Sequence, residues 1–448
     1  MLFLVLTAAL AFYVTWNLGA NDVANSMGTS VGSKAVTLRQ ALAIAGILEF
    51  SGAVLFGHRV SSTLATEIVD PAFFALQPQT LVLGMVSVLM ACGAWLQVAT
   101  AFGVPVASSH AVVGALAGFG WVAVGRQAVA WSVIGLISVT WILTPLLSGA
   151  IAALFYSGIR QWILDRPNPV QQLYEWIPWL STALVSVFGF IVLPFILPPS
   201  QLEAIPLPDH DVFLSLGAIA AVTLTLFHWR RLGYILQQQD HNQQQDYDQS
   251  MDETGRQAAA LPHSSTQPSG MHTAVVEPFL ARFQILSACF VAFAHGSNDV
   301  GNGVAPLAAI AYIHRTGTVP PDEFGIPTWI LVLGGLGIVS GLAVLGKNVI
   351  KTIGEKIIAL QPSGGFCAEL AAATTVLLAS RAGLPVSTSH ALVGAVVGIG
   401  LVQQWRSNRL DQVIQVKTLQ QIALAWLVTL PIAAGLAAAL FSVANAIF

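Results

Sequence analysis

Two short segments of the chain place a carboxylate between carboxamides within otherwise apolar stretches. They read Gly-Ala-Asn-Asp-Val-Ala-Asn at 19–25 and Gly-Ser-Asn-Asp-Val-Gly-Asn at 296–302. A charge at the centre of a bilayer costs about 2.5–3.5 kcal/mol on insertion scales, so an aspartate in such a stretch indicates a functional site. Oxygen ligands suit a small hard cation, whereas the alternative is a polar cluster that only holds helices together. The predicted cation ligands are Asn21, Asp22, Asn25, Asn298, Asp299 and Asn302.

Two further segments combine a proline, hydroxyl side chains and a histidine. They read Pro-Val-Ala-Ser-Ser-His at 105–110 and Pro-Val-Ser-Thr-Ser-His at 385–390, each before a run of small residues. A helix N-terminus exposes unpaired N–H groups and the positive end of the helix dipole, which favours anions. We predict that the hydroxyls bind an anion; the alternative is that they only cap the helices that follow. The predicted anion ligands are Ser108, Ser109, Ser387, Thr388 and Ser389, whereas His110 and His390 either contact the anion or are structural.

Two glutamates also lie within apolar segments, one in each half of the chain. Glu49 and Glu369 do not occupy matching positions of the two halves. Because an ionisable side chain in a membrane segment indicates a pathway for ions or protons, we interpret both as a proton or cation relay. The alternative is a hydrogen-bonded or protonated structural carboxyl group.

The composition shows which elements must position these side chains. Of the 448 residues 55% are hydrophobic and 9% are charged, whereas a soluble protein has roughly 25% charged residues. The chain is therefore expected to be an all-α polytopic membrane protein, since backbone groups in lipid must be satisfied within each segment. The net charge of −3 leaves no basic face for nucleic acid, and the three cysteines lack metal-ligand spacing. About twelve spanning segments are predicted, at 2–20, 40–57, 81–102, 104–125, 128–158, 178–198, 211–229, 279–313, 327–346, 366–381, 384–402 and 420–448.

The two halves of the chain are repeats of each other. Besides the motifs above, Ser51-Gly52 corresponds to Ser340-Gly341, and Trp141 to Trp426, in the same order. Seven predicted crossings separate the two Asn-Asp segments, so the repeats are inverted in the membrane; re-entrant hairpins at 81–125 and 366–402 would leave this parity unchanged. Inverted repeats with broken helices are typical of secondary transporters. Glycines near each aspartate are expected to break its helix and free backbone carbonyls for the cation.

Charge placement predicts the orientation of the chain. The first twenty residues carry no charged side chain, and Lys34 and Arg39 follow them, so both termini are expected outside and the Gln-rich central loop in the cytoplasm. We divide the chain into a first repeat (1–160), connecting transmembrane helices (161–236), a disordered loop (237–276) and a second repeat (277–448). The expected location is a plasma membrane or a bacterial inner membrane.

The paired motifs resemble those of the PiT family of inorganic phosphate transporters, and the resemblance covers both repeats. It implies twelve helices, inverted repeats, re-entrant hairpins and a homodimer. It also implies that the Asn-Asp residues hold cations, that the hydroxyls of the hairpins hold phosphate, and that Glu49 and Glu369 match glutamates needed for transport. One departure is Ala107, which replaces a hydroxyl residue that Ser387 retains in the second repeat.

The function expected from these observations is import of inorganic phosphate by symport with sodium or protons. If sodium is the coupled ion, Asp22 and Asp299 are its predicted metal ligands. No cofactor and no enzymatic activity are expected, because an intramembrane protease dyad would need neither the Asn-rich flanks nor the hydroxyl hairpins. The alternatives are a symporter for sulfate or another tetrahedral oxyanion, and a passive anion channel.

Overall fold

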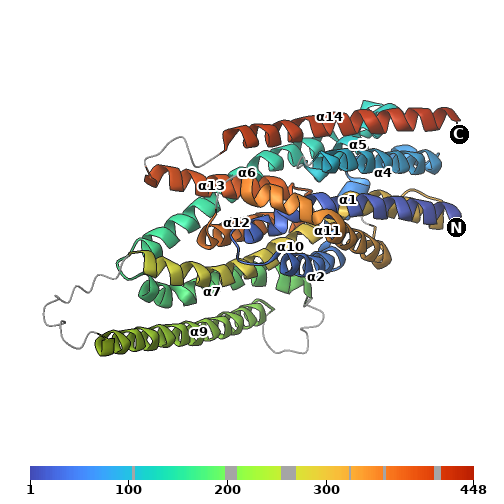
Figure 1. Ribbon diagram of the computed structural model, residues 1–448. Helices are drawn as coiled ribbons and strands as arrows, with labels where there is room; N and C mark the ends of the chain where they lie inside the picture. Colours follow the sequence, from blue (N-terminus) through green and yellow to red (C-terminus); the bar gives the residue numbers. More distant parts are fainter. Residues whose placement is uncertain are drawn as a thin grey trace. The chain divides into compact units, whose positions relative to one another are not determined.

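A computed structural model of the chain describes residues 1–102, 106–196, 209–253, 269–321, 324–356, 360–407 and 415–447 (Figure 1). The described residues form thirteen α-helices, and each of the twelve predicted apolar segments corresponds to one of them. The predicted all-α fold is thus confirmed. The additional helix, α3 (His58–Thr66), is short. The twelve helices are α1 (Leu2–Gly32), α2 (Leu38–Phe56), α4 (Pro78–Ala101), α5 (Ser108–Ala123), α6 (Trp131–Ile159), α7 (Pro169–Ile196), α9 (Asp209–Glu253), α10 (Ser269–Thr316), α11 (Thr328–Lys356), α12 (Pro362–Arg381), α13 (Thr388–Ser407) and α14 (Val416–Ile447).

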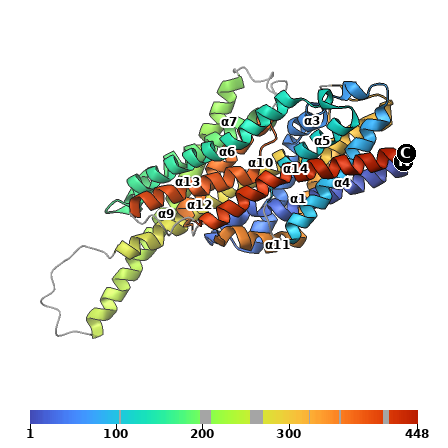
Figure 2. The ribbon, with the colours of Figure 1, turned by 90° about the horizontal axis from the view of Figure 1, so that it is seen from above.

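Nine spans among the described residues are long and apolar enough to cross a membrane. Helix α5 is shorter: its 16 residues extend about 24 Å, less than the roughly 30 Å of a hydrocarbon core. It packs against α4, and α13 packs against α12 in the same way. Helix α14 lies along both α4 and α5 (Figures 1 and 2). These two hairpins therefore carry the hydroxyl segments into the helical bundle.

The helices that carry the Asn-Asp segments are continuous, contrary to the prediction that glycines break them. Helix α1 runs without interruption through 19–25, and α10 through 296–302. The glycines instead allow close helix contacts: a Cβ atom on Gly19 would overlap the carbonyl oxygen of Ile338, and one on Gly296 that of Glu49. The structure therefore shows no freed backbone carbonyls at these two segments, and only their side chains could serve as the predicted cation ligands.

Glycine contacts of this kind join the two repeats in a reciprocal pattern. Gly52 of α2 lies against the carbonyl oxygen of Phe293 in α10, and Gly341 of α11 lies against that of Trp16 in α1. A residue with a side chain could not approach so closely. Each repeat thus packs its first helix on the second helix of the other repeat, as an inverted duplication requires.

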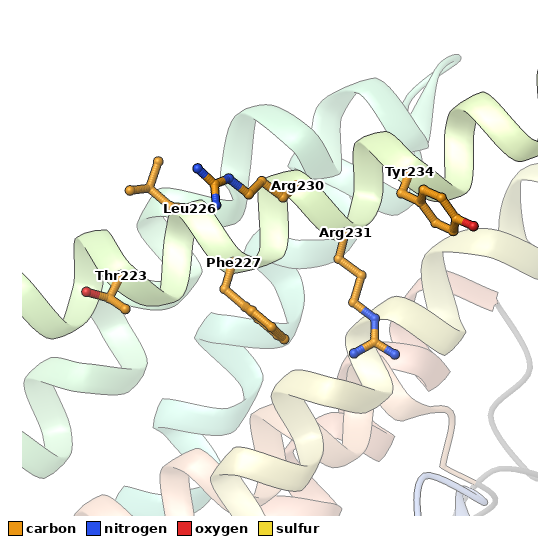
Figure 3. Close-up of a pocket in the computed structure, with 6 residues that line it drawn as sticks. All are labelled: Thr223, Leu226, Phe227, Arg230, Arg231 and Tyr234. Carbon is orange, nitrogen blue, oxygen red and sulfur yellow. The ribbon is translucent and has the colours of Figure 1, made fainter.

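The chain divides into two compact units, Met1–Ser157 with Ala281–Phe448, and Gly158–Leu280. In the second unit α7 packs on α9, where the rings of Tyr174 and Trp229 stack with centroids 5.5 Å apart. Arg230 and Arg231 lie near the end of the candidate membrane span of α9, Val212–Tyr234, and Figure 3 shows their side chains projecting from different sides of the helix. This placement suits the boundary between lipid and water.

One prediction for the segment 237–276 needs correction. Helix α9 continues to Glu253 and α10 begins at Ser269, so a large part of the segment is helical rather than disordered. Glutamine has a favourable helix propensity, so the Gln-rich composition permits the helix to extend beyond the membrane span. Residues 254–268 lie outside the described part of the chain.

Candidate ion and phosphate site

Two aspartates from opposite repeats meet at the centre of the first unit. Asp22 of α1 and Asp299 of α10 lie with His295 so that one ligand atom of each falls within 4.8 Å of the others. All three side chains are buried. The inverted repeat therefore brings the two predicted aspartates into a single centre.

Several buried oxygen atoms around this centre have no hydrogen-bond partner among the described residues. They are Asp22 Oδ2, Asp299 Oδ1, Asn298 Oδ1 and Asn302 Oδ1. A buried polar atom left without a partner costs about 1–3 kcal/mol, and more when it is charged. All four atoms are acceptors of negative or partly negative character. Unpartnered carboxylate and carboxamide oxygens of this kind are the ligands that hard cations prefer.

The carboxamides are oriented by contacts with the hairpins. Asn25 of α1 donates to Ser389 Oγ of α13 (2.9 Å), and Asn302 of α10 donates to Ser108 Oγ of α5 (3.2 Å). The second pair repeats the relation: Asn21 donates to Thr100 Oγ1 (3.2 Å), and Asn298 donates to Ser380 Oγ (3.0 Å). Each NH₂ group thus donates to a hydroxyl group of one of the two hairpins. The predicted cation ligands and the predicted anion ligands therefore form one connected hydrogen-bond network.

The hydroxyls at the start of α13 also reach the aspartate centre. Thr388 Oγ1 donates to Asp299 Oδ2 at 3.1 Å, so a predicted anion ligand contacts a predicted cation ligand directly. Ser109 Oγ is buried and has no hydrogen-bond partner among the described residues. A hydroxyl group in that position is available to an anion at the N-terminus of α5.

The two hairpin helices begin differently. Ser387 precedes α13 and its Oγ accepts from the N–H of His390 (3.3 Å), which is the geometry of a helix cap. Ala107 occupies the equivalent position before α5 and makes no side-chain cap. Ser387, predicted to bind the anion, thus caps its helix in this structure. Pro105, the first residue of the first hydroxyl segment, lies outside the described residues.

The two predicted relay glutamates have unlike surroundings. Glu49 is buried, accepts from Ser26 Oγ (2.7 Å), and lies 3.1 Å from His295 Nδ1. His295 Nε2 lies 3.0 Å from Asp299 Oδ2, which connects Glu49 to the aspartate centre. Both distances are within ion-pair range, although neither pair is aligned as a linear hydrogen bond.

Glu369 lies instead in a separate cluster of side chains that donate hydrogen bonds to it. Its Oε1 accepts from Thr29, Ser30 (2.6 Å each) and Gln284 (3.2 Å), and its Oε2 accepts from Ser287 (2.8 Å). This carboxyl group is buried, and its donors come from α1 and α10. It therefore links the helices of opposite repeats without touching either aspartate.

His110 and His390 form a symmetric pair with two tryptophans. His110 Nδ1 lies 3.1 Å from the carbonyl oxygen of Trp426, and His390 Nδ1 lies 3.0 Å from that of Trp141. The rings lie 3.8 Å from Trp141 and 3.7 Å from Trp426, respectively, and 4.9 Å from each other. These contacts tie the hairpins to α6 and α14, which is the structural role left open for both histidines.

His295 is the residue of this site that sequence reasoning did not single out. Its signal was its position four residues before Asp299, which places both side chains on one face of α10. Comparison of the two repeats does not reveal His295, because the residue at the equivalent position of the first repeat is the apolar Leu18.

With this geometry established, comparison with known proteins identifies the family. The profile of the phosphate transporter family matches residues 18–437. The chain belongs to the phosphate transporter family. It is 39% identical to the inorganic phosphate transporter 2-1, chloroplastic, of Arabidopsis thaliana over 436 residues, which cover 96% of this chain and 70% of that protein. It is 38% identical to a putative phosphate permease of Chlamydia muridarum over 439 residues, 98% of this chain and 97% of that one.

A solved structure supports the same assignment. A protein described as "the sodium-dependent phosphate transporter" superposes with a TM-score of 0.82 at 34% sequence identity, over 100% of both chains. The expected resemblance is thereby confirmed, and this member of the phosphate transporter family is a multi-pass membrane protein and not an enzyme.

Proposed function

We propose that this phosphate transporter imports inorganic phosphate by symport with sodium, and that Asp22 and Asp299 are ligands of the co-transported ion. The observation that carries the proposal is the set of buried, unpartnered oxygens around the two aspartates. Carboxylate and carboxamide oxygens are the ligands that hard cations prefer. The sodium dependence named for the structural relative is consistent with sodium as the ion. Protons remain the alternative coupled ion.

Electrostatics explains why phosphate would need the cation. Phosphate brings one to two negative charges to a centre that holds two aspartates, and neither Asn-Asp segment nor Ser-His segment contains Lys or Arg. Each helix N-terminus contributes only about half a positive charge. At an effective dielectric constant near 20, like charges 4 Å apart repel by about 4 kcal/mol. A cation on the aspartates converts this repulsion into attraction, and the coupling is reciprocal.

The anion side of the proposal rests on the hairpin helices. We assign phosphate to the first turns of α5 and α13, with Ser108, Ser109, Thr388 and Ser389 as hydroxyl ligands, Ser109 foremost because its Oγ is unpartnered among the described residues. Protonated phosphate can donate a hydrogen bond to an aspartate, whereas sulfate cannot. This difference favours phosphate over other tetrahedral oxyanions.

The remaining features of the proposal concern the cell and the assembly. The transporter is placed in a plasma membrane or bacterial inner membrane, with both termini outside and the segment 237–276 in the cytoplasm, from the distribution of Lys and Arg. A homodimer follows from the family resemblance alone. We also assign Glu49 and Glu369 to the coupling of ion and phosphate transport. Glu49 would act through its contact with His295, and Glu369 through its hydrogen bonds to α1 and α10.

The test is uptake of radiolabelled phosphate into proteoliposomes under imposed ion gradients. An inward sodium gradient should drive accumulation of phosphate above its outside concentration, and a potassium gradient of equal size should not. Unlabelled sulfate should compete weakly. Uptake that never exceeds equilibration under any gradient would identify a passive channel, and accumulation driven only by an inward proton gradient would identify proton coupling.

A further inference from the structure

A tryptophan of the first repeat holds both ends of the hydroxyl segment of the second repeat. Trp141 of α6 donates from its indole Nε1 to the carbonyl oxygen of Pro385 (3.1 Å), and its own carbonyl oxygen lies 3.0 Å from His390 Nδ1. A carbonyl oxygen can only accept, so the histidine is the donor. Pro385 and His390 are the first and last residues of the segment Pro-Val-Ser-Thr-Ser-His. The hydroxyl side chains proposed to bind phosphate therefore lie between two buried contacts with one residue.

A proline makes the carbonyl of Trp141 available to the histidine. In a regular α-helix this carbonyl would accept from the N–H of the residue four positions later, but that residue is Pro145, which has no N–H. Pro145 lies inside α6, and a buried carbonyl left without a partner is costly. The contact with His390 supplies the missing donor. The position of Pro145 thus explains why the hairpin bonds to α6 at this point.

The backbone that leads into α13 depends on contacts from other helices. Residues 384–387 form no regular secondary structure. The carbonyl of Leu384 accepts from Asn298 Nδ2 (3.2 Å), and the carbonyl of Pro385 accepts from Trp141. One turn further into the helix, Gly394 of α13 lies against the carbonyl oxygen of Pro145, where α6 and α13 run side by side (Figures 1 and 2). Trp141 therefore contributes to fixing the place at which the first turn of α13 begins.

The equivalent residue of the second repeat, Trp426, shows half of this arrangement. Its carbonyl oxygen lies 3.1 Å from His110 Nδ1, whereas its Nε1 is buried without a hydrogen-bond partner among the described residues. Pro105, the counterpart of Pro385, lies outside those residues. The complete arrangement is thus seen at Trp141, whose ring also lies on that of His110 with centroids 3.8 Å apart. Trp141 consequently contacts both hairpins.

We propose that Trp141 is a positioning residue for phosphate, which holds the hydroxyls of the segment 385–390 where the anion binds. The inference rests on the phosphate site proposed above. Trp141 acts through Thr388 and Ser389 rather than on the anion itself. When its contact with Pro385 is lost, the first turn of α13 is held less firmly, so phosphate affinity falls. Sodium binding in the absence of phosphate should change little, because both Asn-Asp segments lie on other helices.

The test removes only the indole N–H. Trp141→Phe keeps an aromatic ring and the carbonyl that accepts from His390, but it cannot donate to Pro385. The matched control Trp131→Phe makes the same change at the start of α6, where Trp131 Nε1 donates to the carbonyl oxygen of Arg126 (2.9 Å). The half-saturation of phosphate uptake into proteoliposomes is measured for both variants. The unfolding temperature of the purified full-length protein is measured with and without phosphate.

Trp141→Phe should raise the half-saturation for phosphate roughly two- to tenfold, the range expected when one neutral hydrogen bond is lost. Trp131→Phe should leave it unchanged. Because Trp141 acts through the second hairpin, its effect should be smaller when combined with Ser389→Ala than when combined with Ser109→Ala. If Trp141→Phe lowers the phosphate-free unfolding temperature but not the phosphate affinity, Trp141 serves packing only and the inference is wrong. Equal effects in the two combinations would also overturn it.

A second pair of variants decides the question if Trp141→Phe does not fold. His390→Asn keeps a donor for the carbonyl of Trp141, and His390→Leu removes it. The half-saturation for phosphate should be higher in His390→Leu, and equal values in these two variants overturn the inference. If Ser109→Ala and Ser389→Ala both leave the half-saturation unchanged, the phosphate site proposed above is refuted, and this inference with it.

Discussion

The substitution Asp299→Asn tests the cation site with the smallest change of shape. It removes one unit of charge from a buried centre whose ligand atoms lie within 4.8 Å of one another. The carboxamide keeps an oxygen that can accept from Thr388. Packing should therefore be preserved while the attraction for a cation falls.

The size of the effect follows from the electrostatics of the site. A sodium ion about 4 Å from the carboxylate charge gains about 4 kcal/mol at an effective dielectric constant near 20. Since about 1.4 kcal/mol corresponds to a factor of ten, sodium binding should weaken roughly a thousandfold. Reciprocal coupling then removes the part of the phosphate affinity that depends on sodium.

The assay is sodium-dependent phosphate accumulation in proteoliposomes, together with the sodium-induced rise in unfolding temperature of the purified protein. Asp299→Asn should abolish accumulation and flatten the sodium titration, and Asp22→Asn should do the same. The matched control is Asp70→Asn, which makes the same charge change in a loop, where Asp70 is exposed and accepts from the N–H of Ala72. The reasoning is refuted if Asp299→Asn accumulates phosphate with unchanged sodium dependence.

Three further outcomes are expected. Ser109→Ala should raise the half-saturation for phosphate roughly ten- to a hundredfold; an unchanged concentration dependence would exclude Ser109 as a ligand. Gly19→Val should prevent folding because its side chain would overlap the Ile338 carbonyl, whereas Gly135→Ala, with no atom within 4 Å of its new Cβ, should be tolerated; equal yields of both folded variants would contradict the packing described. Cysteine at position 250 should resist impermeant labelling from outside intact cells, and labelling there would reverse the predicted orientation.

Features that occur in both repeats could be predicted from sequence patterns. The Asn-Asp and Ser-His motifs share spacing and order, so the two aspartates could be assigned to one inverted-repeat site. Gly114 and Gly118 lie four residues apart in α5, a spacing that favours close helix packing, and they lie against the backbone of Leu430 and Ala434. Duplication provides this information because a residue type retained at both equivalent positions stands out against variable apolar neighbours.

Features that occur once were harder to predict. His295 is unlike its counterpart Leu18, and its importance appears only when α2 brings Glu49 within 3.1 Å. The continuity of α1 through Gly19 depends on a helix that lies more than three hundred residues later in the chain, at Ile338. Such tertiary contacts override the local tendency of glycine to weaken a helix.

The reciprocal glycine contacts between repeats impose an order on biosynthesis. Helix α1 leaves the ribosome early, but the surface that accepts Gly19 includes Ile338 of α11. At about 5–20 residues per second, synthesis of the intervening chain takes on the order of tens of seconds. During that interval α1, with a carboxylate and several carboxamides, lacks the partners that the second half supplies, such as Ser389 for Asn25. We therefore expect the insertion machinery or a chaperone to shelter the first half until the second emerges, and a chain truncated before α11 to be a substrate for membrane quality-control proteases.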